Sequence, residues 1–503
     1  MGALILSILL MGLQRIIWFI ARKIGDKPAF YPLTFIPSIL YWILLCDENF
    51  MIVGVVGMIL VSLITAFYFT IPSQVVRLVY AILMLPVLYW FTGATYLVFI
   101  VWVVLWEYWR TEWKGKQQIL FMVYSLALIV LLPAWSKTYL VQYPLSKMWT
   151  GADFYRFRNI FPLSIIIFWL LSGCIPLLFH YLPTFSMKKN KVWLGIQLIT
   201  VTGIGFYGIS NVAQWSKEEV MAYDYYARHQ QWNKIISLAD KKTPMSPLSV
   251  SCLNLALSKQ GLMGERMFHY FQNGVEGLMP TFVIDYTIPM VAGEIYYHLG
   301  FINTAQRYAF ESMEAIPDHQ KSGRVVKRLA ETNLINGEYP VAKKYLQILQ
   351  QTYFYKKWAT ETLACLEDES KIDAHPEWGE LRQYRTKTDF LFSEAEKDMM
   401  LGILLQQNLT HRIAYEYLMA YCLLSKDLQH FYQYYPLGKD IGYARIPKSY
   451  QEALVYIWGL RTNDPVKNNP FPISDEVKRQ VQLYGQIYTT NHLGWNSKIE
   501  SSN

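Results

Sequence analysis

The sequence lacks paired cysteines and the short motifs that mark common catalytic sites. Its five cysteines are scattered singly over 503 residues, with no CxxC pair and no metal-ligand spacing. No HExxH, GxSxG or GxxxxGK segment occurs anywhere in the chain. We therefore expect no metal, no cofactor and no catalytic residue, and we expect the cysteines to be small buried hydrophobic side chains.

Charged side chains are scarce in the first 216 residues, and acidic ones are the rarest. This part holds 15 Lys and Arg against 6 Asp and Glu, a net charge of +9, whereas the remainder holds 31 against 32, a net charge of −1. Nucleic-acid binding would need a basic face on the less apolar part, so it is excluded. A basic bias confined to the apolar part instead fits loops that obey the positive-inside rule and touch anionic membrane lipids.

Long hydrophobic runs fill residues 1–215. A helix needs about 20 apolar residues to cross the hydrocarbon, where every backbone amide must bond within its own helix. Residues 1–20 and 28–46 are almost free of charge. Five further stretches contain no Asp, Glu, Lys or Arg: 49–76, 78–106, 117–136, 159–187 and 192–216. The chain starts without a basic segment or an A-x-A cleavage site, so we expect the first run to be a retained span.

The stretch 78–106 decides how many spans are expected, since it reads as one over-long helix or as two short spans hinged at FTGAT, residues 91–95. Two spans put ten basic residues on one side: Arg22, Lys23, Lys27, Arg77, Arg110, Lys114, Lys116, Lys188, Lys189 and Lys191. Four lie opposite: Lys137, Lys147, Arg156 and Arg158. If the stretch is instead one span, the same basic residues divide eight to six between the two sides of the membrane. The positive-inside rule therefore predicts about eight spans and places residues 216–503 outside the cytoplasm.

From Ser216 onward the pattern changes to helices of 12 to 16 residues broken by Gly, Pro and Asp. The clearest segment is LGFINTAQRYAFESMEAIP, residues 299–317. Five residues at fixed offsets resemble the tetratricopeptide repeat (TPR): Gly293, Tyr296, Gly300, Ala305 and Pro317. The resemblance implies that Gly293 and Ala305 let two helices approach closely, that Gly300 ends the first helix, and that Pro317 stops the second.

Weaker copies surround this unit. The next copy holds seven matching residues but has Asn333 where an aromatic is usual: Leu329, Ala330, Gly337, Tyr339, Ala342, Tyr345 and Leu346. An earlier copy has Gln230 in place of the turn glycine: Tyr226, Trp232, Ile235 and Pro247. Residues 254–271 and 411–435 resemble further helical hairpins. The expected fold is therefore all-α, with a transmembrane helical domain at 1–215 and a TPR-like helical solenoid at 216–503.

In TPR proteins the first helix of each hairpin lines a concave groove. Carried over by position, the resemblance places seven residues on the groove wall: Met290, Glu294, Tyr297, His298, Arg324, Lys327 and Glu331. Aromatic side chains and both charge signs suit an extended peptide or a partner helix. The alternative is that these residues form only a solvated helix face.

The one sizeable loop expected outside the cytoplasm spans residues 135–160. If GADFYRFRN forms a helix, Asp153 shares a face with Arg156 one turn away, and Arg158 lies close by. These three residues form an alternative site for an anionic lipid-linked substrate. Such a substrate carries phosphate, and an arginine side chain can donate two parallel hydrogen bonds to one phosphate group. The alternative interpretation is an interfacial helix with one salt bridge.

The whole chain resembles an uncharacterised family of inner-membrane proteins of Bacteroides-type bacteria, known only as a domain of unknown function. The segments DYYARHQQWNKIISLADKK and RMFHYFQNGVEGLMP carry this resemblance, together with the stretch from Ala305 to Leu346. The resemblance implies a multi-pass protein of a Gram-negative inner membrane and supplies no activity.

Three functions follow from these observations. The first is a membrane-anchored scaffold that presents a periplasmic groove to a protein or peptide in envelope assembly or secretion. The second is a membrane glycosyl- or polymer-transferase acting on a lipid-linked substrate, which would rest on the loop at 135–160. The third is a transporter, which is disfavoured because no broken, charge-bearing helix pair is evident.

Overall fold

A computed structural model describes residues 2–110, 115–151, 154–156, 162–184, 187–285, 287–316, 321–386, 390–462, 465–466 and 468–500. The chain divides into two compact units, Met1–Gln214 and Trp215–Asn503, which we call the N-terminal and C-terminal units. Both are helical, and the described residues contain no strand beyond one isolated bridge between Phe50 and Tyr155.

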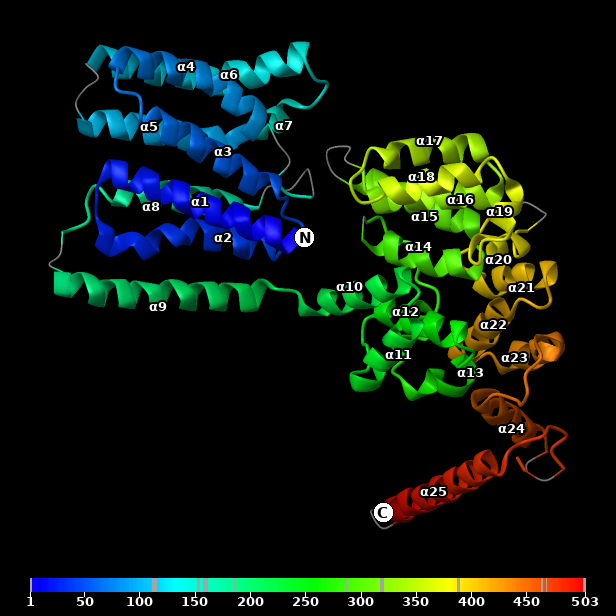
Figure 1. Ribbon diagram of the computed structural model, residues 1–503. Helices are drawn as coiled ribbons and strands as arrows, with labels where there is room; N and C mark the ends of the chain where they lie inside the picture. The colour runs from blue at the N-terminus through cyan, green and yellow to red at the C-terminus, as the bar shows by residue number, and fades with distance from the viewer. Residues whose placement is uncertain are drawn as a thin grey trace. The chain divides into compact units, whose positions relative to one another are not determined.

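The N-terminal unit consists of nine described α-helices with two short 3₁₀ helices among them (Figure 1). The α-helices are α1 (Gly2–Ile24), α2 (Ile36–Leu45), α3 (Val53–Tyr68), α4 (Gln74–Thr92), α5 (Tyr96–Arg110), α6 (Gly115–Tyr139), α7 (Leu145–Thr150), α8 (Leu163–Leu178) and α9 (Met187–Val212). The 3₁₀ helices are η1 (Pro28–Phe35) and η2 (Gly93–Thr95). A core of aliphatic and aromatic side chains, with Trp102 and Tyr68 at its centre, holds them together.

Five helical segments of this unit are long and apolar enough to cross a membrane: Gly2–Ile24, Pro28–Leu45, Gln74–Arg110, Gly115–Tyr139 and Lys191–Val212. Val53–Tyr68 and Leu163–Leu178 are apolar but shorter. At a rise of about 1.5 Å per residue, 16 residues span about 24 Å, which is less than the hydrocarbon thickness of about 30 Å.

The segment Gln74–Arg110 is broken at η2, and its two halves fold back on each other. Gly93 leaves the helical conformation with φ +50° and ψ −143°. Arg77 near the start of α4 reaches Glu107 near the end of α5, with Nε 2.7 Å from Oε1. Residues 30 apart in sequence can meet in this way only if α4 and α5 run antiparallel. The stretch 78–106 is therefore a helical hairpin.

The Arg77–Glu107 pair is almost completely buried, at 1% and 0% exposure. Tyr68 donates its hydroxyl to Glu107 at 2.7 Å, and the remaining Arg77 nitrogen donates to the carbonyls of Ile71 and Pro72. Glu107 lies near the end of an apolar helix, where a charged side chain can often reach water. Here its carboxylate is instead enclosed by the α4–α5 hairpin.

The C-terminal unit consists of short helices packed mostly in consecutive pairs (Figure 1). Its α-helices begin with α10 (Trp215–Arg228), α11 (Trp232–Lys241), α12 (Pro247–Lys259), α13 (Met263–Arg266), α14 (Ile288–Leu299), α15 (Ile302–Ala315), α16 (Gly323–Asn336) and α17 (Tyr339–Gln350). They continue with α18 (Lys356–Cys365), α19 (Glu369–Asp373), α20 (Trp378–Gln383), α21 (Lys397–Gln407), α22 (Arg412–Leu424), α23 (Leu428–Tyr434), α24 (Lys448–Thr462) and α25 (Asp475–Glu500). The 3₁₀ helices are η3 (Met267–His269), η4 (Gly274–Gly277) and η6 (Tyr435–Ile441).

Five hairpins of this unit share one turn. The linker between the helices of each pair contains one residue in the left-handed conformation, with φ between 53° and 94°. These residues are Gln230, Gly261, Gly300, Gly337 and Lys426. In each turn the following amide donates to the carbonyl five residues back, as from Phe301 to Tyr296 at 3.0 Å and from Asp427 to Cys422 at 2.8 Å. This is the Schellman closure, which satisfies carbonyls that a helix end leaves free. The same turn therefore recurs along the unit, including at Gln230, where glycine is absent.

The glycines predicted to matter have the expected local roles. Gly300 ends α14 at φ +94°, and Gly337 ends α16 at φ +85°. A Cβ on Gly293 would lie 3.3 Å from the Cβ of Tyr308, so α14 and α15 approach closely there. Pro317, the last residue of the predicted pattern, lies outside the described residues.

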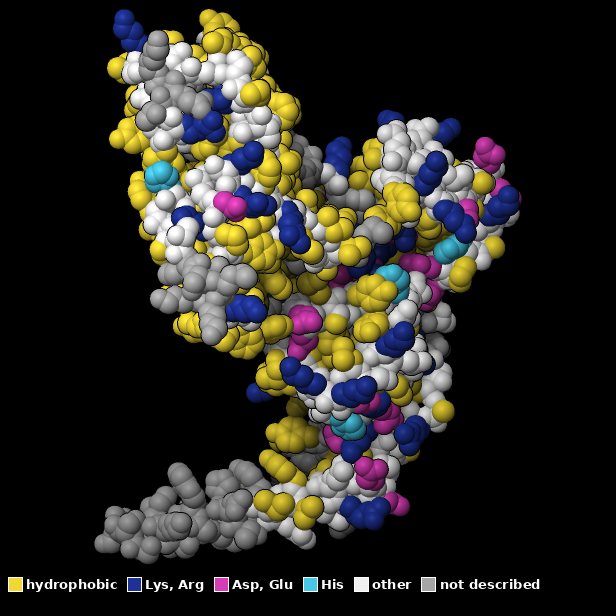
Figure 2. Space-filling model, turned by 60° about the vertical axis from the view of Figure 1, so that its left-hand side comes forward, with side chains coloured by type: hydrophobic (Ala, Val, Ile, Leu, Met, Phe, Trp, Pro, Cys, Tyr) yellow, Lys and Arg dark blue, Asp and Glu magenta, His cyan; other side chains and the backbone are white. Residues whose placement is uncertain are grey.

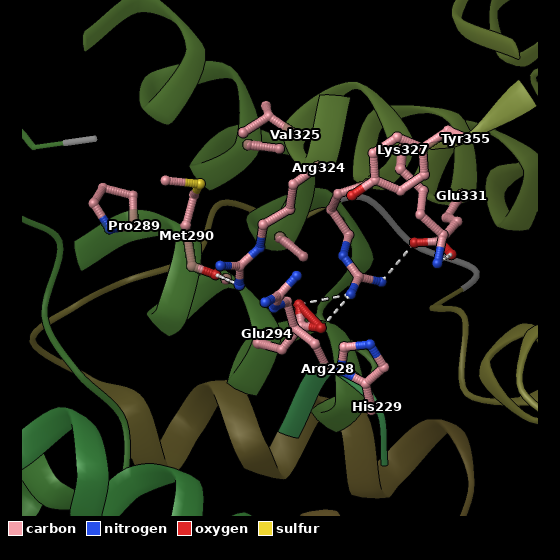
Figure 3. A pocket seen from close by; sticks show the side chains of 14 residues that line it. Arg228, His229, Pro289, Met290, Glu294, Arg324, Val325, Lys327, Glu331 and Tyr355 are labelled. Carbon is pink, nitrogen blue, oxygen red and sulfur yellow. Dashed lines mark hydrogen bonds and ion pairs between the residues drawn. The ribbon is translucent and has the colours of Figure 1, made fainter. Parts of the chain in front are cut away.

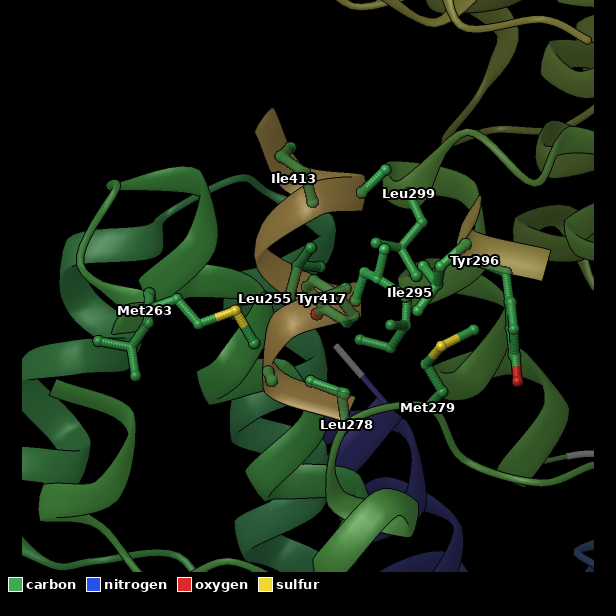
Figure 4. Close-up of a cluster of buried hydrophobic side chains, with 14 of the residues drawn as sticks. Leu255, Met263, Leu278, Met279, Ile295, Tyr296, Leu299, Ile413 and Tyr417 are labelled. Atoms are coloured by element: carbon green, nitrogen blue, oxygen red, sulfur yellow. The ribbon is translucent and has the colours of Figure 1, made fainter. Parts of the chain in front are cut away.

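The core of the C-terminal unit runs from α10 to α25 and joins distant parts of the sequence. Figure 4 shows the region where α12, α14 and α22 meet. The labelled side chains are Leu255, Met263, Leu278, Met279, Ile295, Tyr296, Leu299, Ile413 and Tyr417. Because α22 packs against α12, the later hairpins close onto the earlier ones instead of extending a simple stack.

The surfaces of the two units differ. Most exposed large hydrophobic side chains belong to the N-terminal unit, although it is the shorter one. In the view of Figure 2, hydrophobic side chains gather over that unit and acidic ones over the C-terminal unit. The cysteines follow the expectation in part, since Cys252 and Cys422 are buried, Cys46 and Cys365 are half-buried, and Cys174 is exposed.

Candidate functional site

A cavity of about 160 Å³ lies among the first helices of three hairpins in the C-terminal unit (Figure 3). The end of α10 supplies Arg228 and His229, and α14 supplies residues from Pro289 to Glu294. Helix α16 supplies residues from Arg324 to Glu331. Ala305 and Ala309 of α15 and Tyr355 complete the lining.

Three buried carboxylates of this site occupy equivalent positions in their hairpins. Asp224, Glu294 and Glu331 each lie six residues before the left-handed turn residue, which is Gln230, Gly300 and Gly337 in turn. The common turn therefore places the three acids at one register of α10, α14 and α16. This alignment is a sequence feature, because the turn positions are visible without a structure.

Arginines of α16 connect the three acids. Arg324 makes two hydrogen bonds to Asp224, at 2.7 and 2.8 Å, and a third to the carbonyl of Met290 at 3.0 Å. Arg328 donates to both oxygens of Glu294 at 2.6 Å and lies 3.0 Å from Glu331. Arg324 and Asp224, 100 residues apart, thus form a bidentate ion pair, which fixes geometry as well as charge. Arg328 and Glu294, 34 residues apart, are joined through one arginine nitrogen.

Two further cations lie at the outside of the cluster. The Arg228 Nε lies 3.3 Å from Asp224, and the Lys327 Nζ lies 3.3 Å from Glu331. The four cationic side chains are 16–35% exposed, whereas the three carboxylates are 5–10% exposed. The cations are therefore more exposed than the acids, although Glu294 and Glu331 also line the cavity. In Figure 3, Arg228, Arg324 and Glu294 point toward the same space.

The arginines keep Glu294 ionised despite its burial. Burial alone would raise the pKa of Glu294, but the charges of Arg328 and Arg324 outweigh it and lower the pKa to about 2. Burial lowers the pKa of His298 to about 3, so this imidazole is neutral near pH 7. Since His298 carries no charge, the positive charge at the cavity comes from the arginines and Lys327.

Five of the seven groove residues predicted from the sequence line this cavity: Met290, Glu294, Arg324, Lys327 and Glu331. The structure places the other two elsewhere. Tyr297 is fully buried with Arg328 stacked 3.4 Å above its ring, and His298 is buried against Trp232. Tyr297 and His298 follow Glu294 by three and four residues and so share its helix face. They are covered because Arg328 of α16 packs on the Tyr297 ring and Trp232 of α11 packs on His298.

Sequence reasoning missed Asp224, Arg228, Arg328 and Tyr355. Asp224 could have been found, because it has the same offset from Gln230 that Glu294 has from Gly300. Arg328 follows Arg324 by four residues and therefore shares its helix face. No sequence signal places Tyr355, which reaches the cavity because its ring packs against Gly323 at the start of α16.

The alternative site at residues 135–160 differs from the predicted helix. Asp153 and Arg158 lie outside the described residues. Residues 154–156 are not helical: the amide of Arg156 donates to Asn49 at 2.7 Å, and the amide of Met51 donates to Phe154 at 3.0 Å. The helix on which this alternative site depended is therefore not formed at residues 154–156, because backbone pairing with the loop before α3 holds them extended.

Among the described residues, no group of three or more His, Cys, Asp or Glu side chains is arranged to hold a metal ion. The charged side chains that line the cavity offer ionic and hydrogen-bonding contacts.

Comparison with known proteins gives the family and nothing about activity. No curated protein and no solved structure matches the chain. A family described only as a family of unknown function (DUF6057) matches residues 1–498, which is nearly the full length. The chain therefore belongs to this uncharacterised family.

Proposed function

We propose that the protein is a membrane-anchored binding protein, whose C-terminal unit is a TPR-like solenoid that docks a protein or peptide partner. The observation that carries the proposal is the convergence of three first helices, α10, α14 and α16, on one cavity. First helices of repeated hairpins form the binding surface of helical solenoids. The recurring turn supports the repeat, although α22 closes onto α12 where a simple solenoid would stay open.

The anchor is the N-terminal unit. Its five long apolar segments are suited to lipid, and the α4–α5 hairpin turns one of them into two helices. The α4–α5 hairpin turns the five long segments into six helices. With the shorter helices Val53–Tyr68 and Leu163–Leu178, the unit has eight apolar helices. An even number of crossings returns the chain to the side on which it started. With basic loops in the cytoplasm, the C-terminal unit then stands in the periplasm of a Gram-negative cell.

Site-specific photo-crosslinking tests the docking proposal in living cells. A benzophenone amino acid would replace Met290 in the cavity, and a matched control would replace Lys343, an exposed residue of the second helix α17. We expect a discrete crosslinked polypeptide from position 290 and none from position 343. Identical patterns at both positions, or no adduct at either, would overturn the proposal.

A further inference from the structure

The cavity has the size of one side chain. Small-molecule sites enclose roughly 300–1,000 Å³, and this cavity holds about 160 Å³. That space admits a single side chain with its end group, which agrees with the peptide docking proposed above.

The charge facing the cavity is positive. Arg228, Arg324, Lys327 and Arg328 supply four positive charges, and Asp224, Glu294 and Glu331 supply three negative ones, so the cluster carries +1 (4 − 3). Glu377 does not line the cavity and accepts a hydrogen bond from Gln230 at 2.9 Å. Burial, together with repulsion from Glu331, raises the pKa of Glu377.

The inner arginines contact the carboxylates more extensively than the outer cations do. Arg324 makes two hydrogen bonds to Asp224, and one nitrogen of Arg328 contacts both oxygens of Glu294. Among the described residues Arg228 makes one ion pair, through Nε, with Asp224. Lys327 has one ion pair and lies over the ring of Trp358. Arg228 and Lys327 are therefore the cations available to an incoming anion.

Two backbone features strengthen the preference for an anion. The first turns of α14 and α16 both border the cavity, through Met290 and through Arg324 and Val325. The positive end of each helix dipole points toward negative charge placed there. Met290, Val325 and Tyr355 add an apolar wall beside the cations. An aliphatic stem ending in a carboxylate matches both surfaces.

We propose that the cavity binds an acidic side chain of a partner polypeptide, attracted by the positive charges of Arg228 and Lys327 in its lining and with its stem against Met290, Val325 and Tyr355. The proposal rests on the docking function above and names the chemistry of the partner. Arg324 and Arg328 act as positioning residues, because their pairs with Asp224 and Glu294 hold the three helices in register.

Peptide binding to the full-length protein in detergent micelles tests this inference. The probes are a fluorescent ten-residue polyglutamate peptide with an amidated end and a matched polyglutamine peptide. The variants are Arg228→Gln combined with Lys327→Gln, and the control Lys357→Gln, an exposed lysine outside the cavity. We expect the polyglutamate peptide to bind at least tenfold more tightly than polyglutamine. The double variant should lose at least tenfold in affinity, and the control should stay within twofold of the wild type.

The outcomes separate this inference from the function on which it rests. Equal affinity for both peptides, or equal affinity of the wild type and the double variant, overturns the acidic side chain. If Met290 still crosslinks to a polypeptide in cells, the docking function survives that result. Saturable binding of inorganic phosphate without any peptide binding would make the occupant a free anion, and it would overturn the inference. Loss of both peptide binding and crosslinking removes both proposals.

Discussion

Both units bury arginine–glutamate pairs, but they do so in opposite ways. In the N-terminal unit, Arg77 and Glu107 are enclosed, and Tyr68 with two carbonyls satisfies the remaining hydrogen-bonding groups. In the C-terminal unit, the carboxylates are covered while the cations border a cavity. A closed pair has no capacity left for a ligand and serves to join two helices. An open cluster has charge in excess and a place to bind.

The largest effect is expected from opening the closed pair. Glu107→Leu leaves Arg77 buried without a counter-charge, and breaking a buried pair costs about 3–5 kcal/mol. The combined variant Arg77→Met with Glu107→Leu removes both charges and should recover most of that loss. Thermal unfolding of the detergent-solubilised protein measures both. If the double variant is no more stable than Glu107→Leu alone, the pair is not the lock between α4 and α5.

The next largest effect concerns Glu294, a buried carboxylate of the open cluster, and appears as a pH dependence of stability. The pKa of Glu294 is lowered from 4.5 to about 2, so its contribution is complete above about pH 4.5 and is lost as the pH falls toward 2. A shift of this size corresponds to about 3 kcal/mol. Glu294→Gln should therefore lose most of its stability deficit at low pH. Unfolding free energies of the wild type and Glu294→Gln at pH 6 and pH 2.5 test this, and a constant difference would contradict it.

Much of the local structure could be predicted from the sequence because it depends on local chemistry. Charge-free runs predicted the apolar helices, and glycines at fixed offsets predicted the ends of α14 and α16. The FTGAT segment offered two interpretations, and the hairpin shows that the chain reverses there. That outcome depends on the long-range Arg77–Glu107 contact, which no local pattern contains.

The site was predictable only in part for a similar reason. The resemblance to TPR repeats placed Met290, Glu294 and Arg324 on one wall, but it could not tell which of their neighbours pack into the core. Tyr297 is buried because Arg328 covers its ring, a contact between α14 and α16. Arg228, at the end of α10, and Tyr355, just before α18, lie far apart in the sequence, yet both line the cavity. Tertiary packing decides such positions, so offsets along one helix are insufficient.

A smaller effect is expected at the two glycine turns, which bear on the comparison because they set the register of the acids. Alanine in the left-handed conformation costs about 1–2 kcal/mol. Gly300→Ala should cost more than Gly337→Ala, because its Cβ would lie 3.2 Å from the Cβ of Tyr384, whereas Gly337 has one neighbour, at 3.8 Å. Denaturant unfolding of both variants gives the order, and the reverse order would contradict the shared role of these turns.

The smallest effect has the opposite sign. Lys426 adopts φ +60°, a conformation that costs a side chain free energy and costs glycine little. Lys426→Gly relieves left-handed strain of about 1–2 kcal/mol, and the greater freedom of glycine in the unfolded chain offsets about 0.5–1 kcal/mol of that gain. The C-terminal unit should therefore be stabilised by about 0.5–1 kcal/mol. Lys343→Gly, in the interior of α17, is the matched control and should destabilise instead. A loss of stability in Lys426→Gly would show that its side chain matters more than its backbone strain.

The central claim is that apolar helices hold the open cluster outside the cytoplasm, and the most direct test is the side of the membrane on which the C-terminal unit lies. The measurement is labelling by a membrane-impermeant maleimide in intact spheroplasts, using a chain whose five cysteines are replaced by alanine. We predict that the Lys357→Cys variant is labelled at once and that the Lys116→Cys variant, in the first turn of α6, is labelled only after permeabilisation. Labelling of the Lys116→Cys variant in intact spheroplasts, with protection of the Lys357→Cys variant, would contradict the account.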